Sequence, residues 1–188
     1  GGGRTISWNA FSKPSQIDGV SFTYDGGGQR VKKTSASGTT LYVTNDYEIN
    51  DGAVTKYVRL GEQPIAKKTG STQYWLHGDH LQSINVITNA AGAEVKRVTY
   101  RPFGEQLSES GSHFESLSFT RERRDAETGL MYLNARYYDP GLGKFLSTDP
   151  LASPEMPAGL NRYAYCANDP INATDRSGLK KKRWKKNG

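Results

Sequence analysis

Four aspartates near the C-terminal end of the chain carry the side chains best suited to acid–base chemistry. Asp139, Asp149 and Asp169 each precede a proline, and Asp175 opens the run Asp-Arg-Ser-Gly-Leu. Two carboxyl groups about 3 Å apart cannot both ionise, so they share one proton and can act as acid and base in peptide hydrolysis. An aspartate before a proline is also a common turn residue, because its side chain caps the backbone and proline fixes φ. The residue types alone leave a catalytic and a structural role open for each aspartate.

The remaining polar side chains suggest no metal or cofactor site. His77 and His80 flank Asp79, but a structural zinc site usually has four ligands in a recognised spacing. The glycines of residues 26–28 are not followed by the Gly-Lys-Ser of a phosphate-binding loop. The single cysteine, Cys166, permits no internal disulfide. We predict that it is a small buried apolar residue rather than a reactive thiol.

The net charge of +6 comes from the end of the chain. Residues 180–188 carry six positive charges and no negative charge, so the rest of the chain is formally neutral. A solvated tail is the simplest prediction for such a run. The alternative is a salt-dependent contact of the tail with nucleic acid or an anionic membrane surface.

The composition favours a thin sheet over a thick core. The 188 residues have a mean hydropathy of −0.72 and include 21 glycines and 11 tyrosines, which suits one domain or one piece of a larger shell. No apolar run reaches the 18 residues of a membrane span. The first residues lack the charged and apolar pattern of a signal peptide. We therefore expect an internal piece of a longer protein, whose export signal lies outside this sequence.

Short strands separated by turns are predicted over the first hundred residues. Residues 20–24 alternate apolar and polar side chains, as in a strand with one buried face. Asp51 and Gly52 predict a tight hairpin turn. Further strands are predicted at residues 29–34, 39–44, 47–50, 53–60, 63–68, 72–76, 83–88 and 94–100.

Two polar stretches follow these strands. Residues 105–118 are rich in serine and glutamate and are predicted to form a loop. In residues 121–124 arginines surround Glu122, and we predict a solvated strand or loop there.

Six motifs follow one another in the last third of the chain and identify a family resemblance. They occupy residues 125–140, which include Thr-Gly-Leu and Ala-Arg-Tyr-Tyr-Asp-Pro, and then residues 143–145, 149–150, 161–165, 168–172 and 175–179. In this order they resemble the C-terminal core of the Rhs/YD-repeat family, found in bacterial polymorphic toxins and Tc toxin C components. Residues 22–31 and 98–107 also resemble the YD repeat, which is intact at Tyr24-Asp25 and degenerate at Tyr100-Arg101.

The resemblance implies a mainly β fold. It predicts a YD-repeat strand-turn-strand sheet, part of a curled β-shell, that ends in an inward-spiralling C-terminal plug. A unit of strand and turn cannot bury its face alone, so such repeats stack on their neighbours. We expect a YD-repeat sheet over residues 1–120, a core or plug over residues 121–179 and a basic tail over residues 180–188.

The resemblance also implies self-cleavage by an aspartic-type autoprotease that acts once. The family motif places the cut between Leu179 and Lys180. Asp149 and Asp175 are the implied catalytic pair, and Arg136 is implied to orient a carboxylate or to hold the strand with the scissile bond. Asp139 and Asp169 are the reserve candidates for the catalytic acids.

Two positions depart from the family motif. Arg176 follows Asp175 where proline is usual, and Lys144 stands where arginine is usual. A cation beside Asp175 would lower the pKa of its carboxyl group and oppose proton sharing. Lysine lacks the planar fork of arginine. Both departures predict slow or absent cleavage.

The resemblance implies partners outside this sequence. It predicts the remainder of an Rhs shell, a C-terminal toxin or effector segment and a secretion apparatus, in a bacterial protein that is secreted or delivered as part of a larger chain. The alternative is a secreted, non-enzymatic β module that binds carbohydrate or protein through its tyrosine-rich strands.

Overall fold

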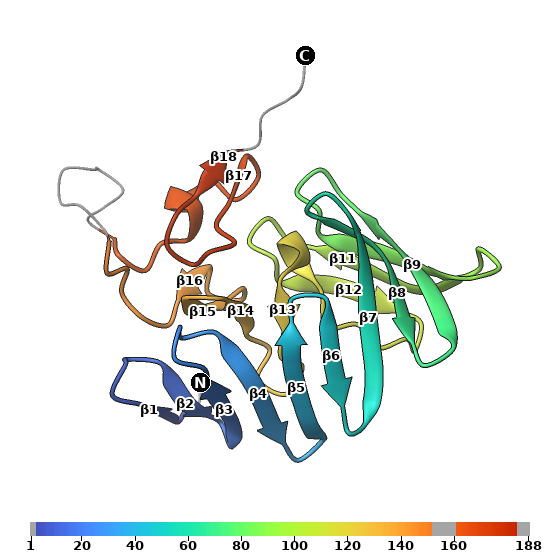
Figure 1. Cartoon of the computed structure of the whole chain (residues 1–188). Coiled ribbons are helices and arrows are strands. Elements are labelled where there is room, and N and C mark those ends of the chain that lie inside the picture. The colour runs from blue at the N-terminus through green and yellow to red at the C-terminus, as the bar shows by residue number, and fades with distance from the viewer. Residues whose placement is uncertain (1–2, 152–160, 184–188) are drawn as a thin grey trace. The chain divides into compact units, whose positions relative to one another are not determined.

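The structure is a computed structural model that describes residues 3–151 and 161–183 of the chain (Figure 1). Antiparallel strands dominate it, and two short 3-10 helices, η1 and η3, interrupt them. The strands are β1 (Ile6–Trp8), β2 (Pro14–Ile17), β3 (Val20–Tyr24), β4 (Arg30–Ser35), β5 (Gly38–Thr44), β6 (Tyr47–Asn50), β7 (Ala53–Leu60), β8 (Gln63–Thr69), β9 (Thr72–Gly78), β10 (Ile84–Asn89), β11 (Glu94–Tyr100), β12 (Gln106–Ser110), β13 (Arg123–Arg124), β14 (Met131–Leu133), β15 (Arg136–Asp139), β16 (Lys144–Phe145), β17 (Ala173–Thr174) and β18 (Lys182–Arg183). The helices are η1 (Phe119–Arg121) and η3 (Tyr165–Asn168).

The strands form three sheets. Strands β1 to β12 are hydrogen-bonded in sequence order, β13 to β16 form a four-stranded sheet, and β17 pairs with β18. The chain divides into two compact units, the first comprising Gly1–Trp75 and Asn89–Gly92 and the second comprising Leu76–Thr88 and Ala93–Gly188. The boundary expected at residues 120 and 121 lies inside the second unit. The prediction of a mainly β, strand-turn-strand fold is confirmed.

The hairpins of the first unit follow from alternation and turn chemistry. In β3 the side chains of Val20 and Phe22 are buried, whereas those of Ser21 and Thr23 are exposed. The tight turn predicted between β6 and β7 is present, with φ of 45° at Asp51 and 86° at Gly52. Positive φ at both central residues is typical of the type I′ turn, whose twist matches that of the flanking strands.

The aspartate of the YD repeat is a turn residue in this unit. Asp25 Oδ1 accepts hydrogen bonds from the backbone N–H groups of Gly27 and Gln29, both at 2.9 Å. The backbone N–H of Asp25 donates to the carbonyl of Gln29. The side chain thereby satisfies amide groups that the tight bend between β3 and β4 leaves outside the strand ladder.

The polar stretch 105–118 was predicted to be a loop, and this is wrong for its first part. Residues 106–110 form β12, which pairs with β11 from Arg97↔Ser110 to Tyr100↔Gln106. Its side chains are mostly exposed, so hydrophobic alternation gives no signal of a strand. Backbone hydrogen bonds to β11 hold it in place, and these do not depend on side-chain polarity.

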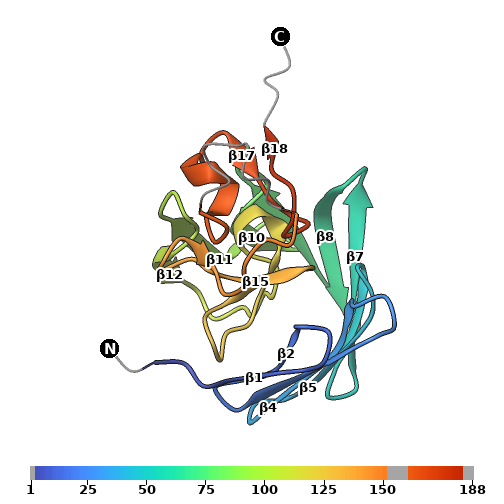
Figure 2. The ribbon, with the colours of Figure 1, turned by 90° about the vertical axis from the view of Figure 1, so that its left-hand side faces the viewer.

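Aromatic side chains form the core of the second unit. Met131 and Tyr138 are cross-strand partners in the β14–β15 hairpin. The ring of Tyr138 lies 4.5 Å, centroid to centroid, from that of Tyr165 in η3. Cys166 is free and buried beside them, as predicted. Figure 2 shows β17 and β18, which pair through Ala173↔Arg183 and Thr174↔Lys182 at the C-terminal end of this unit.

Within the described residues, no helix has the length and apolar character needed to cross a bilayer.

Candidate functional site

Arg136 occupies the centre of the candidate site. It is the first residue of β15 and pairs with Leu133 across a two-residue turn in which Asn134 has a φ of 56°. Its side chain is 3% exposed, and its guanidinium carbon lies 3.6 Å from the centroid of the Phe145 ring. The ring and the sheet hold the guanidinium in a fixed position, out of water.

The guanidinium contacts both members of the predicted catalytic pair. Its Nη2 lies 3.1 Å from Asp149 Oδ2 and 3.7 Å from Asp175 Oδ2. Its Nη1 donates to the carbonyl of Arg162 at 3.1 Å, and its Nε donates to the carbonyl of Gly178. Burial lowers the pKa of Arg136, and the two carboxylates oppose this shift. Arg136 therefore connects β15 to three later segments, at Asp149, at Arg162 and at residues 175–178.

Asp149 reaches this site from the segment that follows β16. Its Oδ1 accepts the backbone N–H of Leu151 at 2.8 Å, as expected of an aspartate before proline. Its backbone carbonyl accepts two hydrogen bonds from the Arg162 guanidinium, at 3.0 and 2.8 Å. Asp149 thus closes a turn with one carboxylate oxygen and faces Arg136 with the other.

Asp175 holds the backbone around the predicted cleavage point. Its Oδ1 accepts the backbone N–H of Leu179 at 3.1 Å, that of Lys180 at 3.0 Å and the hydroxyl of Ser177 at 3.1 Å. Burial raises the pKa of the Asp175 carboxyl group, and these hydrogen bonds together with Arg136 oppose the rise. The amide nitrogen of the Leu179–Lys180 bond therefore lies against a carboxyl group that burial pushes toward its neutral form.

The two carboxyl groups both contact Arg136, and they do not contact each other through a hydrogen bond. No hydrogen bond joins the side chains of Asp149 and Asp175, both of which belong to the described part of the chain. The arrangement differs from a dyad that shares one proton at about 3 Å. It offers instead a buried carboxyl group at the amide of the predicted cut and a second carboxylate that contacts the same guanidinium nitrogen.

The segment before the predicted cut is fastened to the β14–β15 turn. Asn134 Nδ2 donates to the carbonyl of Arg176 at 2.8 Å, and the backbone N–H of Ala135 donates to the carbonyl of Ser177 at 3.1 Å. Gly178 has a φ of 70°, and a Cβ there would lie 2.3 Å from the carbonyl oxygen of Leu133. Only glycine fits this close approach.

The reserve aspartates shape turns away from Arg136. Asp139 Oδ1 accepts the backbone N–H groups of Gly141 at 3.0 Å and Leu142 at 3.2 Å. Asp169 Oδ1 accepts the side-chain amide of Asn172 at 2.8 Å. These contacts match the structural role of an Asp-Pro turn.

Arg176 does not act on Asp175 as expected. Its Nε donates to Glu122 Oε1 at 2.9 Å, and the pKa of Asp175 is raised rather than lowered. The net shift is opposite in direction to the one expected from Arg176, because burial of Asp175 is its largest cause and the Arg176 guanidinium pairs with another carboxylate. Lys144, the second departure from the motif, is exposed in β16.

Glu122 is a site neighbour that sequence reasoning missed. The arginine-rich residues 121–124 were predicted to be solvated, yet Arg121 is 6% exposed and Glu122 is 9% exposed. The prediction of a solvated stretch is wrong at these two positions. An isolated acid among three arginines was the only signal available, and it is equally typical of an exposed strand.

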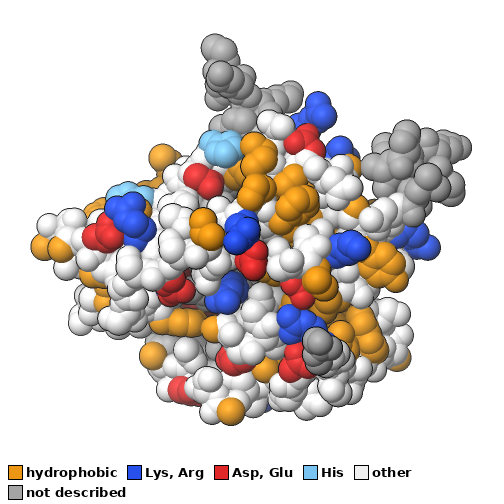
Figure 3. Space-filling view, turned by 180° about the vertical axis from the view of Figure 1, so that it is seen from behind, with side chains coloured by type: hydrophobic (Ala, Val, Ile, Leu, Met, Phe, Trp, Pro, Cys, Tyr) orange, Lys and Arg blue, Asp and Glu red, His pale blue; other side chains and the backbone are white. Residues whose placement is uncertain are grey.

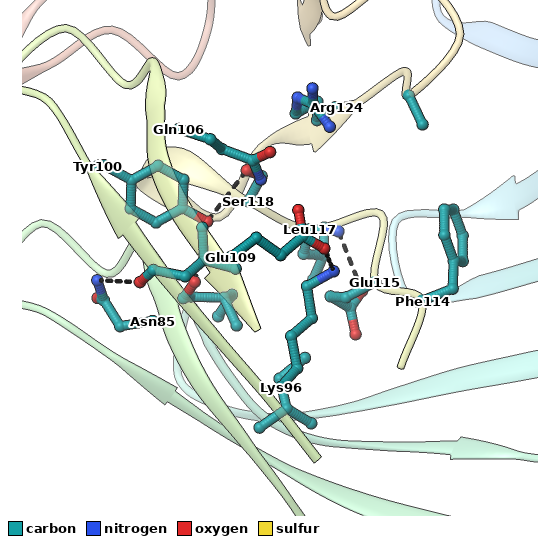
Figure 4. Close-up of a pocket in the computed structure, with 14 residues that line it drawn as sticks. Asn85, Lys96, Tyr100, Gln106, Glu109, Phe114, Glu115, Leu117, Ser118 and Arg124 are labelled. Atoms are coloured by element: carbon teal, nitrogen blue, oxygen red, sulfur yellow. Dashed lines mark hydrogen bonds and ion pairs between the residues drawn. The ribbon is translucent and has the colours of Figure 1, made fainter. Parts of the chain in front are cut away.

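A separate small cavity of about 50 Å³ lies elsewhere in the second unit (Figure 4). Strands β10 to β12 and the segment around Ser118 line it. Tyr100 donates to the carbonyl of Ile84 at 2.9 Å and lies 3.1 Å from the Ser118 hydroxyl, and Lys96 pairs with Glu109. None of the predicted catalytic residues lines this cavity.

The ordered motifs and the sheet agree with a comparison to known families. A family profile described as Teneurin YD-shell matches residues 20–171, about four-fifths of the chain. The chain belongs to the YD-shell family. The match includes Arg136 and Asp149 but ends before Asp175 and the predicted cut.

Bacterial relatives of this YD-shell chain carry toxin-related names. It is 30% identical over 174 residues to the tRNA nuclease WapA of Bacillus subtilis, covering 85% of this chain and 7% of the relative. It is 28% identical over 199 aligned positions to the toxin subunit YenC2 of Yersinia entomophaga, covering 89% of this chain and 20% of the relative. These relatives confirm the resemblance to Rhs/YD-repeat proteins.

The YD-shell fold also matches a solved structure. The crystal structure of TcdB2-TccC3 superposes with a TM-score of 0.80 at 22% identity, covering 94% of this chain and 10% of that chain. The likeness confirms the fold. The chain spans no more than a fifth of the length of each of these matched proteins.

Proposed function

We propose that this chain is the C-terminal part of a YD-repeat shell that encloses and delivers a C-terminal toxin segment, and that it cuts itself once after Leu179. The fold and the family support the shell. The names of the relatives support a toxin, and one matched structure is described as TcdB2-TccC3 without its hypervariable C-terminal region. A variable segment that follows a YD-shell core agrees with a cut at the end of that core.

One observation supports the cleavage above all others. Asp175 Oδ1 accepts the backbone N–H of Lys180 at 3.0 Å, and the nitrogen of Lys180 is the atom that would leave if the Leu179–Lys180 peptide bond were hydrolysed. A proton donor must lie within hydrogen-bond reach of the atom that it protonates. Burial raises the pKa of Asp175, which favours the protonated acid that such a donor requires.

The proposed reaction assigns a different role to each aspartate. Asp149 accepts a proton from water, and the water oxygen adds to the carbonyl carbon of Leu179. Asp175 donates its proton to the nitrogen of Lys180 as the carbon–nitrogen bond breaks, leaving a carboxyl group on Leu179 and an amine on Lys180. The side chain of Asp149 is 17% exposed and that of Asp175 is 5% exposed, so water reaches the proposed base more easily than the proposed acid.

Arg136 supports the reaction as a positioning residue. Its bond to the carbonyl of Gly178 fixes the residue before the scissile dipeptide, and its contacts with both carboxylates fix their orientation. Its Nη2 donates to Asp149 Oδ2 at 3.1 Å, which fixes the carboxylate that would act as the base.

Intact mass spectrometry of the folded chain tests the proposal. We expect a fragment that ends at Leu179 together with the peptide of residues 180–188. Asp149→Asn and Asp175→Asn should each slow the cut by at least about 100-fold, because a general acid or base contributes roughly 10²–10⁴ in rate. Asp139→Asn and Asp169→Asn are matched controls and should cut at the rate of the unchanged chain.

Two outcomes would contradict the cleavage proposal. Full-length mass in every chain after long incubation would remove the protease and leave a non-enzymatic shell. Equal cutting in the Asp175→Asn chain would show that the Lys180 contact is only a turn cap. Circular dichroism of each variant establishes that the fold is retained.

A further inference from the structure

Arg176 links the predicted cleavage segment to a part of the chain 54 residues earlier. Its Nε lies 2.9 Å from Oε1 of Glu122, with the two side chains 35% and 11% exposed. Glu122 follows η1 directly, and its backbone N–H and carbonyl are both used, in bonds to Phe119 and Ser118. The carboxylate therefore projects from a fixed backbone toward the segment that carries Asp175.

The main chain of Arg176 is fastened as well. Asn134 Nδ2 donates to its carbonyl at 2.8 Å, while its neighbour Ser177 accepts the backbone N–H of Ala135 at 3.1 Å. A residue other than proline leaves φ free to rotate. Here Glu122 holds the side chain of Arg176, and the β14–β15 turn holds its carbonyl. These two contacts limit the rotation about φ.

We propose that Glu122 and Arg176 form a latch that positions the Asp175–Lys180 segment for cleavage. The inference rests on the proposed self-cleavage and deepens it, because it adds two positioning residues that touch no reacting atom. Rotation at residue 176 would swing Asp175 away from Arg136 and the Lys180 amide away from Asp175. The latch keeps acid, cation and scissile bond in one arrangement, and misplacement by about 1 Å can cost roughly 100-fold in rate.

The charges around Glu122 make the latch sensitive to acid. Arg176, Arg121 and Arg123 all face this carboxylate and favour its ionised form, but burial outweighs them and raises its pKa. Protonation of Glu122 removes the charge on which the pair depends. Glu122 therefore takes up its proton at a higher pH than an ordinary glutamate does. The ion pair of the latch is lost as the pH falls through that range.

Amide hydrogen exchange at Leu179 and Lys180 tests the latch without requiring cleavage. In an Asp149→Asn background, which keeps the chain intact, we expect Arg176→Gln and Glu122→Gln each to lower the protection of these two amides by about 10-fold. The double variant should lose no more amide protection than either single variant, because the two side chains act as one pair. Arg176→Lys, which keeps the charge, should restore part of the protection.

The pH profile separates the latch from the titration of Asp175. The difference in protection between the background chain and its Glu122→Gln variant should shrink as the pH falls, and vanish once Glu122 is protonated. A control variant, Arg101→Gln, removes an exposed ion pair in the same unit, between Arg101 and Glu105 at 3.1 Å, and should leave both amides unchanged.

Three results would overturn the latch: unchanged protection in both single variants, an equal loss in Arg101→Gln, or a loss spread over the whole β14–β15 ladder. In the chain with both aspartates, Arg176→Gln should also slow the cut by about 10-fold. If no chain cuts, the self-cleavage proposal fails, while the exchange data still decide whether Glu122 and Arg176 position the segment.

Discussion

At the scale of single residues, Asp175 shows two opposing effects on one carboxyl group. Arg136, two backbone N–H groups and a hydroxyl all favour the ionised form. Removal from water favours the neutral form and is the larger effect, so the pKa is raised. The same residue can therefore cap a turn when ionised and donate a proton when neutral.

The raised pKa of Asp175 predicts how stability depends on pH. A folded pKa above the unfolded value of about 3.9 means that the folded chain binds the proton more tightly. The contribution of Asp175 is therefore fully present below that value, and it is lost as the pH rises through the folded pKa. We expect the free energy of unfolding of the unchanged chain, measured in urea relative to Asp175→Asn, to fall over this window.

The Asp175→Asn variant is the control for the unchanged chain, because the asparagine side chain does not titrate. A difference that grows with pH would mean that Arg136 outweighs burial, and would argue against Asp175 as the acid.

At the scale of elements, the β14–β15 hairpin is the platform of the site. All residues of its two strands are buried, and its turn holds the backbone of residues 176 and 177. Arg136 begins β15 at the end of this turn, so a single hairpin positions both the guanidinium and the segment before the proposed cut. A local change at the contact between turn and segment should therefore reach the cleavage point.

Gly178→Ala tests this contact. A Cβ would lie 2.3 Å from the carbonyl oxygen of Leu133 and 3.0 Å from the backbone nitrogen of Arg136, at a φ of 70°. We expect a loss of about 3 kcal/mol of stability in denaturant unfolding, from overpacking added to backbone strain.

Gly129→Ala is the matched control. Gly129 has nearly the same φ, 71°, but no atom lies within 4 Å of the position of its Cβ. Only backbone strain remains, so about 1 kcal/mol should be lost. Equal losses at the two glycines would show that the segment moves freely away from the turn.

At the scale of the whole molecule, charge separates the tail from the rest of the chain. Both signs are interspersed on the face shown in Figure 3, and no large patch of one sign gathers there. Of the basic tail, Lys182 and Arg183 form β18, and Arg183 lies 3.7 Å from Asp169. Four of the six positive charges of the tail lie in the described residues 180–183, and the other two, at Lys185 and Lys186, lie outside the described residues. The contact of the tail with nucleic acid or membrane stays a prediction.

Self-cleavage should therefore change the charge of the molecule. The six positive charges of residues 180–188 account for the entire net charge of +6. The two products should be separated in urea, which breaks the pairing of β17 with β18. At neutral pH a cation-exchange column should retain the intact chain, whereas the fragment of residues 1–179 should flow through. If the large fragment bound the column as tightly as the intact chain, the cut would lie elsewhere. The Asp149→Asn variant, which is expected to stay intact, is the reference.

The sequence alone determined the features that depend on local chemistry or on ordered motifs. The hairpin at Asp51-Gly52 follows from residues that tolerate positive φ, and the strand at residues 20–24 follows from alternation. The order of motifs from residue 125 to residue 179 identified the family. These signals are short in range or contiguous, so each can be read without knowing what packs against it.

Only the tertiary structure decided which charges meet. Residues 121–124 have the pattern of a solvated stretch, yet Glu122 is buried and paired with Arg176. The polar residues 106–110 form a strand because β11 offers them backbone partners. Asp149 and Asp175 both reach the same nitrogen of Arg136, at 3.1 and 3.7 Å. Burial and pairing depend on residues brought together by folding, and the free energy of a charge depends on those neighbours and on exclusion of water more than on its own type.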